Sequence, residues 1–236
     1  MSSASTIPPR PFSRPVLDRL AGLSPRAEHS DSLFAAPLGP DEHGFYLPRF
    51  AVFGANTSDT DARLSVLAGF AQGDDASSLA AFDLIEAAAA APEAVGGLVL
   101  DVVPVVNRSG GDLWSASWIH AERAELALLE REYRRVPPHA RLQLRSGTQM
   151  YPHGVIHGAS IEHWLDGAPA VLFSAGWSRQ ALNRAEPEGI DSLVPDLPFR
   201  PLELQLTLGL DADGNAAALH AIVQRIRQLL AHGQYL

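Results

Sequence analysis

Apolar and polar positions along the chain follow two periods, one typical of β-strands and one typical of α-helices. Short apolar or alternating runs that end in glycine, proline or asparagine predict strands. The run over 98–106 is apolar almost throughout, which is typical of a strand buried on both faces of a sheet. Strands are predicted over 49–53, 63–68, 98–106, 141–144, 154–157, 170–173 and 202–208.

Apolar residues three and four positions apart predict helices between these strands. In the segment 119–135, Leu126, Leu129 and Tyr133 form one stripe, and charged residues flank it. Because strands and helices alternate, the pattern predicts an α/β protein, a three-layer α/β/α sandwich around a mixed, largely parallel central sheet. The other predicted helices cover 77–91 and 216–231, with a short one over 16–23.

The regular pattern does not begin at the first residue. Residues 1–45 are rich in proline and serine and weakly periodic, so we predict an N-terminal extension that lies on the surface. Residues 46–236 are predicted to form the α/β domain. A chain of 236 residues fits one such domain better than two, and it can bury most of its apolar surface.

Composition narrows the chemistry that the chain can perform. The chain has no cysteine, which excludes disulfides, thiolate metal sites and cysteine nucleophiles. Its net charge is -9 and its arginines are scattered, so no nucleic-acid partner is expected. No apolar run is long enough to cross a bilayer, and the N-terminus lacks the apolar segment of a secretory signal. We therefore predict a cytoplasmic protein without a membrane partner.

Polar residues gather where several predicted strands end. In an open α/β sheet, ligands bind at the carboxyl ends of the strands. Such ends occur over 69–75, 107–113 and 142–147, and Glu203 lies in the last predicted strand. No GxSxG, Walker or dinucleotide-binding pattern accompanies them, so a serine hydrolase or a nucleotide-binding protein has little support.

The first of these strand ends resembles a zinc-binding motif. Residues 68–75 read Ala-Gly-Phe-Ala-Gln-Gly-Asp-Asp and lead into a predicted helix. The zinc carboxypeptidases, together with the succinylglutamate desuccinylase and aspartoacylase branch, have a similar segment reading Ala-Gly-Ile-His-Gly-Asp-Glu, whose His and Glu bind zinc. In this chain Gln72 stands at the position of that His, and Asp75 stands at the position of that Glu.

The second strand end resembles the next motif of the same family. Residues 104–110 are similar to its Pro-Val-Xaa-Asn-Pro-Xaa-Gly segment and include Asn107. The family continues with Gly-Xaa-Asp-Leu-Asn-Arg, whose Asn-Arg pair holds the substrate carboxylate. Asp112 is retained from that segment, but Trp114 begins the pair that replaces Asn-Arg.

Two later segments complete the resemblance. The family has a strand that ends in Leu-His-Ser, whose His is the third zinc ligand, and Arg145 replaces this His in residues 144–146. Residues 202–204 resemble the Thr-Xaa-Glu-Leu segment that carries the family's general base, so the resemblance gives Glu203 that vestigial role.

The resemblance implies a zinc cofactor, but the substitutions argue against one. A catalytic zinc needs about three protein ligands and one open position. Glutamine is a poor ligand, and a guanidinium stays charged and has no lone pair to offer. We therefore predict no metal and no other cofactor at Gln72, Asp75 and Arg145. Buried carboxylates without a metal need a new cation, so Arg145 is predicted to pair with Asp75, Glu203 or both.

The predicted site also has plainer interpretations. Asp74 and Asp75 can cap the predicted helix, Asn107 can bond loop backbone, and Glu203 can form a salt bridge. The residues predicted to bind a ligand are Asn107, Asp112, Trp114, Arg145 and His153.

The function predicted from these residues is that of a non-catalytic relative, a pseudoenzyme. Its partner would be an unknown small molecule or peptide, an amino-acid derivative, or another protein. Two alternatives stay open. One is a metal-dependent hydrolase with a rearranged site, using Asp75, Glu203 and either His153 or His157. The other is a structural subunit of an assembly. A retained concave site would favour the ligand-binding pseudoenzyme. A bound metal would favour the hydrolase, and a large apolar surface patch would favour the structural subunit.

Overall fold

The structure of the chain is a computed structural model. It describes residues 12–41, 44–58, 61–71, 73–107, 124–147, 151–155, 202–209 and 211–231; at 151–155, 202, 203 and 212 it describes the backbone only. The predicted strand over 170–173 falls outside the described residues, as do Gln72, Asp112, Trp114 and His157.

Strands and helices alternate along the described chain, as the periodicity predicts. The helical elements are α1 (Arg14–Ala27), α2 (Asp75–Ala90), the 3-10 helix η1 (Pro92–Val95), α3 (Ala124–Arg135) and α7 (Ala212–Ala231). The strands are β1 (Leu33–Ala35), β2 (Phe50–Phe53), β3 (Ala62–Leu67), β4 (Leu98–Val103), β5 (Ala140–Ser146), β6 (Tyr151–Val155) and β7 (Leu202–Leu208). Strand β7 has the predicted bounds, and every residue of β4 is buried, as predicted.

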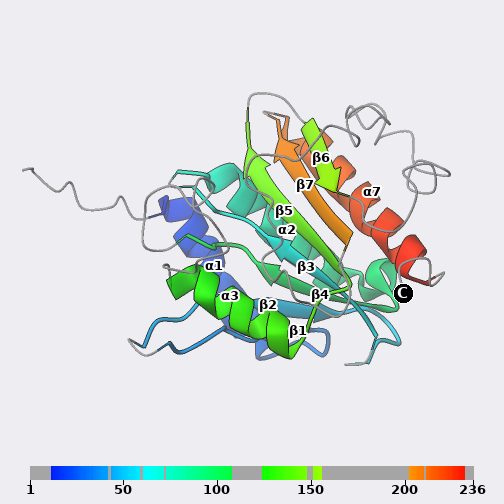
Figure 1. Ribbon diagram of the computed structural model, residues 1–236, viewed down its shortest axis with the longest axis horizontal. Helices are drawn as coiled ribbons and strands as arrows, with labels where there is room; N and C mark the ends of the chain where they lie inside the picture. The colour runs from blue at the N-terminus through cyan, green and yellow to red at the C-terminus, as the bar shows by residue number, and fades with distance from the viewer. Residues whose placement is uncertain are drawn as a thin grey trace, which may run out of the picture.

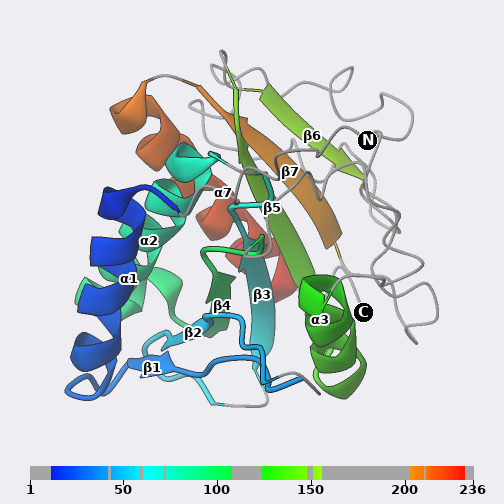
Figure 2. The ribbon, with the colours of Figure 1, turned by 90° about the vertical axis from the view of Figure 1, so that its left-hand side faces the viewer.

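The strands form one mixed sheet between two helical layers, which confirms the predicted α/β/α class. The strand order is β1-β2-β4-β3-β5-β7-β6. Strands β4, β3, β5 and β7 run parallel, whereas β1, β2 and β6 pair antiparallel with their neighbours. The ribbon views show α1, α2 and α7 on one side of the sheet and α3 on the other (Figures 1 and 2).

The two faces of the sheet bury different sets of residues. The face toward α1, α2 and α7 carries the larger apolar core, which includes Leu64 and Val66 of β3. The face toward α3 carries a smaller core around Leu126, Leu129 and Tyr133. These three residues form the stripe predicted for α3, and all three are buried. The amphipathic pattern of this helix therefore identifies its buried side correctly.

Part of the predicted N-terminal extension belongs to the sheet and its core. We predicted a helix over 16–23 and otherwise a segment lying on the surface. In the structure α1 is longer, and Val16 and Leu23, two turns apart on one side of it, are buried in the larger core. Strand β1 pairs with β2 at the sheet edge and buries Leu33. The N-terminal segment thus adds one strand and one covering helix to the α/β layers.

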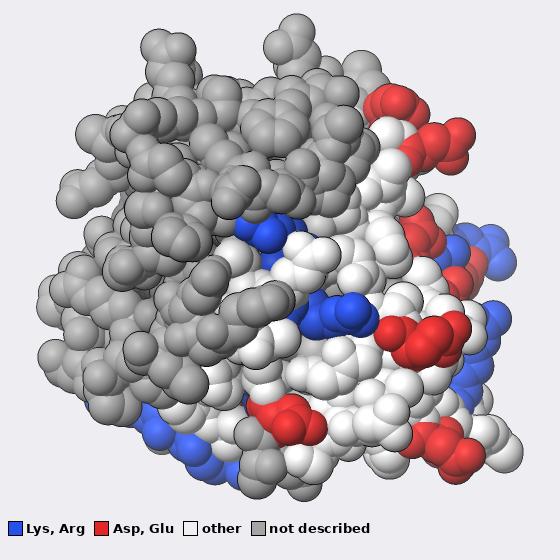
Figure 3. All heavy atoms as spheres, turned by 90° about the vertical axis from the view of Figure 1, so that its right-hand side faces the viewer, with Lys and Arg blue, Asp and Glu red and all other residues white. Residues whose placement is uncertain are grey.

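The described surface carries interspersed charges. On the face shown in Figure 3, arginine and acidic side chains lie near one another, and neither sign of charge gathers into a large area. In the described part of the chain, every helix is too short or too polar to span a bilayer.

Gly54 closes the end of β2 against the loop that precedes β4. Its N–H donates to the carbonyl oxygen of Leu98 at 3.1 Å. A Cβ atom added to Gly54 would lie 1.9 Å from the carbonyl oxygen of Val95 and 2.8 Å from the Cα of Gly96. Both neighbours are backbone atoms, which cannot rotate away as a side chain can, so this close approach requires glycine.

Gly54→Ala is therefore expected to lower the free energy of unfolding by about 3 kcal/mol, because the backbone must move to admit the methyl group. Gly22 offers a control, since it lies exposed in α1 and an added Cβ would have no atom within 4 Å. Gly22→Ala should raise the same free energy by about 0.5–1 kcal/mol through helix propensity. Urea unfolding measures both, and unchanged stability of Gly54→Ala would contradict the close approach.

Candidate site at the carboxyl end of the sheet

Asp74 joins the start of α2 to the end of β5. Its carboxylate accepts a hydrogen bond from the backbone N–H of Ser77 at 3.4 Å, which caps the helix. The same oxygen accepts from the backbone N–H of Ser146 at 3.1 Å and from the Ser146 hydroxyl at 2.5 Å. The interpretation of Asp74 as a helix cap is confirmed, and this buried carboxylate also holds two elements together. We call these contacts the Asp74–Ser146 clamp.

The loops that follow β3 and β4 are tied to each other beside this clamp. Gly69 follows β3 with a φ of 67°, and its N–H donates to the hydroxyl oxygen of Ser77 at 3.0 Å. Asn107 follows β4; its backbone N–H donates to the carbonyl oxygen of Gly69 at 2.9 Å, and its side-chain amide to that of Phe70 at 2.8 Å. The bonding of Asn107 to loop backbone is confirmed, whereas its part in ligand binding stays a prediction.

Arg145 lies at the carboxyl end of β5, one residue before Ser146. Its side chain is exposed, although the five preceding residues of the strand are buried. Asp75, the first residue of α2, is partly buried. We expected Arg145 to pair with Asp75, but no ion pair joins them among the residues that the structure describes. The helix start is instead held to β5 by the neighbouring Asp74.

Glu203 lies toward the opposite end of the sheet. It is the second residue of β7, and its Cα pairs with that of Arg141, whereas Arg145 pairs with Thr207. Glu203 and Thr207 are four residues apart along β7, which corresponds to about 13 Å. The structure therefore does not bring the backbone of Glu203 to Asp75 and Arg145. The side chain of Glu203 lies outside the described structure, so its salt-bridge interpretation stays a prediction.

The remaining predicted ligand-binding residues are placed only in part. His153 lies in the edge strand β6, where its Cα pairs with that of Gln205 in β7. Its side chain is not among those described, and the roles predicted for Gln72, Asp112 and Trp114 fall on residues outside the described ranges. Their contributions to the site stay predictions.

This arrangement of strands and helices is also found in solved structures of other proteins. No protein-family model matches the sequence, and no curated protein matches it. A solved metallo-carboxypeptidase from Pseudomonas aeruginosa, in complex with (2-guanidinoethylmercapto)succinic acid, is similar with a TM-score of 0.69 and 17% identity, over 94% of this chain and 70% of its own. One from Burkholderia cenocepacia has a TM-score of 0.64 and 14% identity, over the same shares, 94% and 70%. This chain has the metallo-carboxypeptidase fold.

A more distant source gives the same result for the metallo-carboxypeptidase fold. Bovine thrombin-activatable fibrinolysis inhibitor, in complex with tick carboxypeptidase inhibitor, is similar with a TM-score of 0.64 and 12% identity, over 93% of this chain and 96% of its own. Such identities show the fold alone. Metal binding and activity therefore have to be argued from the residues at the site.

The two described residues that the motif resemblance places at zinc-ligand positions, Asp75 and Arg145, are a poor match to zinc. Arg145 carries a permanent positive charge and no lone pair. Asp74 directs one carboxylate oxygen, Oδ1, to Ser77 and Ser146. Asp75 supplies one carboxylate where about three ligands are needed. Within the described ranges, no group of three or more His, Cys, Asp or Glu residues could hold a metal ion.

A second group of charged residues lies on the α3 side of the sheet, and the sequence analysis missed it. Glu132 of α3 accepts hydrogen bonds from Arg49 at 2.6 Å and from Arg135 at 2.8 Å. Burial alone would raise the pKa of Glu132, but Arg135 and Arg49 outweigh burial and hold this pKa below its ordinary value. No local pattern signals this pairing, because Arg49 lies 83 residues away from Glu132 along the chain.

His139 connects the same region to β5. Its Nδ1 accepts a hydrogen bond from the backbone N–H of Arg63 at 3.1 Å. Burial, and secondly the positive charge of Arg63, lower the pKa of His139. Nδ1 can accept this hydrogen bond only when it carries no proton, so the fold favours the neutral imidazole.

The Asp74–Ser146 clamp gives a testable difference between two adjacent carboxylates. Asp74→Ala removes the helix cap and both hydrogen bonds to Ser146, so the free energy of unfolding should fall by about 2 kcal/mol. Asp75→Ala removes the same charge but only an interaction with the helix dipole, so the free energy of unfolding should fall by about 0.5 kcal/mol. Urea unfolding compares the two variants. Equal losses would mean that the charge at the helix start matters and the clamp does not.

The lowered pKa of His139 predicts how stability depends on pH. The unfolded chain has the ordinary, higher pKa and binds the proton first, so folded stability should be lost as pH falls from about 7.5 to about 5.5. His139→Gln keeps a side-chain oxygen that can accept from Arg63, and it should lose less stability over this range. Urea unfolding at several pH values tests this, and parallel curves for the two proteins would contradict it.

Proposed function

We propose that this chain is a non-catalytic relative of the zinc carboxypeptidases, which binds a ligand at the carboxyl end of its sheet without zinc and without hydrolysing it. The observation that carries the proposal is Arg145. It stands at the end of β5, where the resembling motif has a zinc-binding His. A guanidinium and a divalent cation about 4 Å apart would repel each other by about 8 kcal/mol at an effective dielectric constant of about 20.

Hydrolysis would need groups that this site does not combine. A zinc peptidase uses the metal to activate water and to polarise the scissile carbonyl, and the residues at the ligand positions do not support a metal. Glu203, the residue that the motif suggested as the base, lies toward the other end of β7. A single carboxylate such as Asp75, without a metal or a positioned partner, is a weak catalyst of amide hydrolysis.

Ligand binding is favoured by the polar groups that the fold gathers at this end. Asp75, Arg145 and Ser146 lie at the start of α2 and the end of β5, and the carboxyl ends of parallel strands are where open α/β sheets bind ligands. The class of ligand that we propose, a peptide or an amino-acid derivative, follows from the family resemblance. Arg145 offers a charge that suits a ligand carboxylate.

The proposal predicts the metal content of the purified protein. After incubation with zinc and desalting, the protein should retain less than about 0.1 zinc ion per chain, because the three positions do not supply three ligands. Elemental analysis measures the metal, and Asp75→Ala should leave the result unchanged. Near-stoichiometric zinc that is lost on Asp75→Ala would overturn the proposal and support the metal-dependent hydrolase with a rearranged site.

A pair of matched variants isolates the effect of Arg145. The triple variant Q72H/D75E/R145H restores the residue types of the family and should retain at least about fivefold more zinc than the wild type. The double variant Q72H/D75E keeps the guanidinium and should not. Equal zinc retention by the double and triple variants would show that Arg145 is not what excludes the metal.

A further inference from the structure

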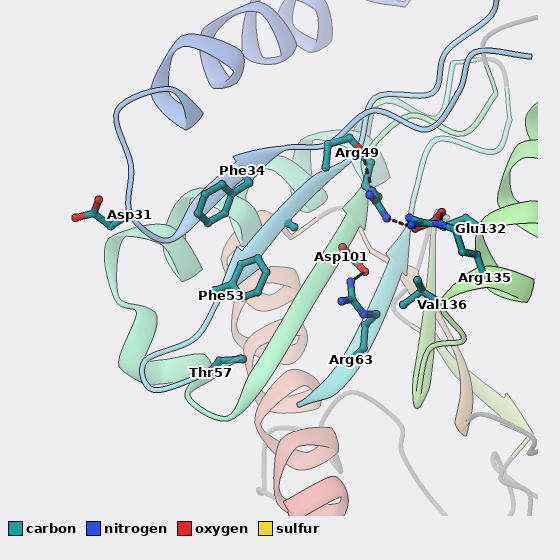
Figure 4. A pocket seen from close by; sticks show the side chains of 12 residues that line it. Asp31, Phe34, Arg49, Phe53, Thr57, Arg63, Asp101, Glu132, Arg135 and Val136 are labelled. Atoms are coloured by element: carbon teal, nitrogen blue, oxygen red, sulfur yellow. Dashed lines mark hydrogen bonds and ion pairs between the residues drawn. The ribbon is translucent and has the colours of Figure 1, made fainter. Parts of the chain in front are cut away.

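A hollow of about 700 Å³ opens on the α3 side of the sheet, over β1, β2, β4 and β3 (Figure 4). Its volume lies in the range of small-molecule sites, about 300–1,000 Å³. We call it the sheet-face hollow; its polar lining includes Arg49, Arg63, Asp101, Glu132 and Arg135. Arg63 is the second residue of β3, so this hollow lies toward the opposite end of β3 from the Asp74–Ser146 clamp.

A small residue in the sheet helps to form the hollow. The pairing of β1, β2, β4 and β3 places Phe34, Ala51, Asp101 and Ser65 side by side. Residues paired in this way project to the same face of a sheet. Ala51 lies between Phe34 and Asp101, and its side chain is a single methyl group. The small side chain leaves space between the ring and the carboxylate, and this space is part of the hollow. At the other end of the row, Ser65 shares a hydrogen bond with Tyr133 of α3.

Three arginines and three acids line the hollow, and positive charge exceeds negative charge only in the cluster around Asp101 and Glu132. Three guanidinium groups face two carboxylates: Arg63 donates to Asp101, and Arg49 and Arg135 donate to Glu132. The balance of three positive and two negative charges is one positive charge, in a chain whose net charge is -9. A further acid, Asp31, lies at the far rim and points away from this cluster (Figure 4).

The arginines of the hollow are placed where they can donate hydrogen bonds to a ligand. A guanidinium has five N–H donors, and the Arg135 side chain, which is 67% exposed, directs two of its nitrogens to Glu132. The side chains of Arg49 and Arg63 are each 14% exposed, so water screens their charges less than it would at an open surface. Arg135 and Arg49 hold the pKa of Glu132 below its ordinary value although burial alone would raise it, which agrees with a positive potential in this region.

Asp101 shows that the polar lining is not fully matched within the protein. This residue is 7% exposed, and one of its oxygens accepts a hydrogen bond from Arg63. The other oxygen, Oδ1, is buried and has no hydrogen-bond partner among the described residues. Because Oδ1 can only accept a hydrogen bond, an N–H or O–H donor would satisfy it and an anionic group would not. The Asp101 carboxylate holds the Arg63 guanidinium within the hollow.

An aromatic pair forms the apolar side of the hollow. The rings of Phe34 and Phe53 meet edge to face, with centroids 5.4 Å apart and planes at 84°. Phe34 is 44% exposed, so part of its ring is accessible from the hollow. The close-up view shows both rings on the same side of the hollow, across from Arg49 and Glu132 (Figure 4).

We propose that the sheet-face hollow binds a small organic anion that carries an aromatic group. Arg49, Arg63 and Arg135 hold the anionic group, and the ring of the ligand packs against Phe34 and Phe53. Carboxylates and phosphates share the oxygen geometry that guanidinium groups bind, and both are suitable. The site lies apart from the carboxyl end of the sheet, so it stands or falls independently of the function proposed there.

Isothermal titration calorimetry of the full chain at low salt tests the proposal with two probes, benzoate and phenyl phosphate. At least one should bind with a Kd of about 1 mM or tighter. The tighter of the two identifies the anionic group as a carboxylate or a phosphate. Benzylamine, which carries the opposite charge, should bind at least about tenfold more weakly than either. Inorganic phosphate, which lacks the ring, should also bind at least about tenfold more weakly than phenyl phosphate.

Variants assign the binding to the hollow. Arg135→Gln should weaken the tighter probe at least about fivefold, because it removes one exposed cation while Arg49 still pairs with Glu132. Arg134→Gln is the matched control: it makes the same change one residue earlier in α3, where the side chain pairs with Glu130 outside the hollow, and the Kd should not change. Ala51→Leu should abolish binding by filling the floor, with its fold checked by circular dichroism.

Three results would overturn the proposal. The first is an absence of binding by both anions at about 10 mM, far above the Kd expected for ligands of this size. The second is a Kd that is the same in Arg135→Gln as in the wild type. The third is equal affinity for benzylamine. Each would mean that the arginines and carboxylates form a hydrated network of salt bridges and not a binding site.

Discussion

Strand β4 sets a requirement that the rest of the structure has to meet. All six of its residues are buried, so both faces of the sheet must be covered at its centre. On one face α1, α2 and α7 provide this cover through the larger core, and on the other α3 provides it through the smaller core. Asp101 lies in the middle of β4, where apolar cover gives way to charged residues. A buried carboxylate needs a cation, and Arg63 on the adjacent parallel strand supplies it.

Most of the fold could be predicted because periodicity directly reflects which faces of an element are buried. The seven residues of β7 alternate, and the stripe of α3 lies at helical spacing, so no information from elsewhere in the chain is needed to recognise them. The N-terminal segment differs. Its proline and serine content indicated an extension, whereas the burial of Val16 and Leu33 depends on contacts with α2 and β2, which lie far along the chain.

The candidate site was harder to predict, because a motif gives residue types and does not say how far along a strand each residue lies. The predicted strand 202–208 already implied that Glu203 lies near the start of β7, yet the resemblance of residues 202–204 to a family motif suggested the other end. The sheet-face hollow had no local signal at all. Phe34, Ala51 and Asp101 become neighbours only through the pairing of three strands, and Arg49 meets Glu132 only in the folded chain.

The Asp74–Ser146 clamp provides a physical reason why the carboxyl end of the sheet can keep its geometry without a metal. In a zinc site, ligands from a helix start and a strand end are held together by their shared ion. Here Asp74 and Ser146 are the immediate neighbours of Asp75 and Arg145, and they bond directly, at 3.1 and 2.5 Å. A carboxylate that accepts a backbone N–H and a hydroxyl is satisfied within the protein, so this contact does not depend on a bound cation. This contact would keep the ends of β5 and α2 ordered if, as proposed, the site holds no zinc, and ordered polar ends are what a ligand needs for binding.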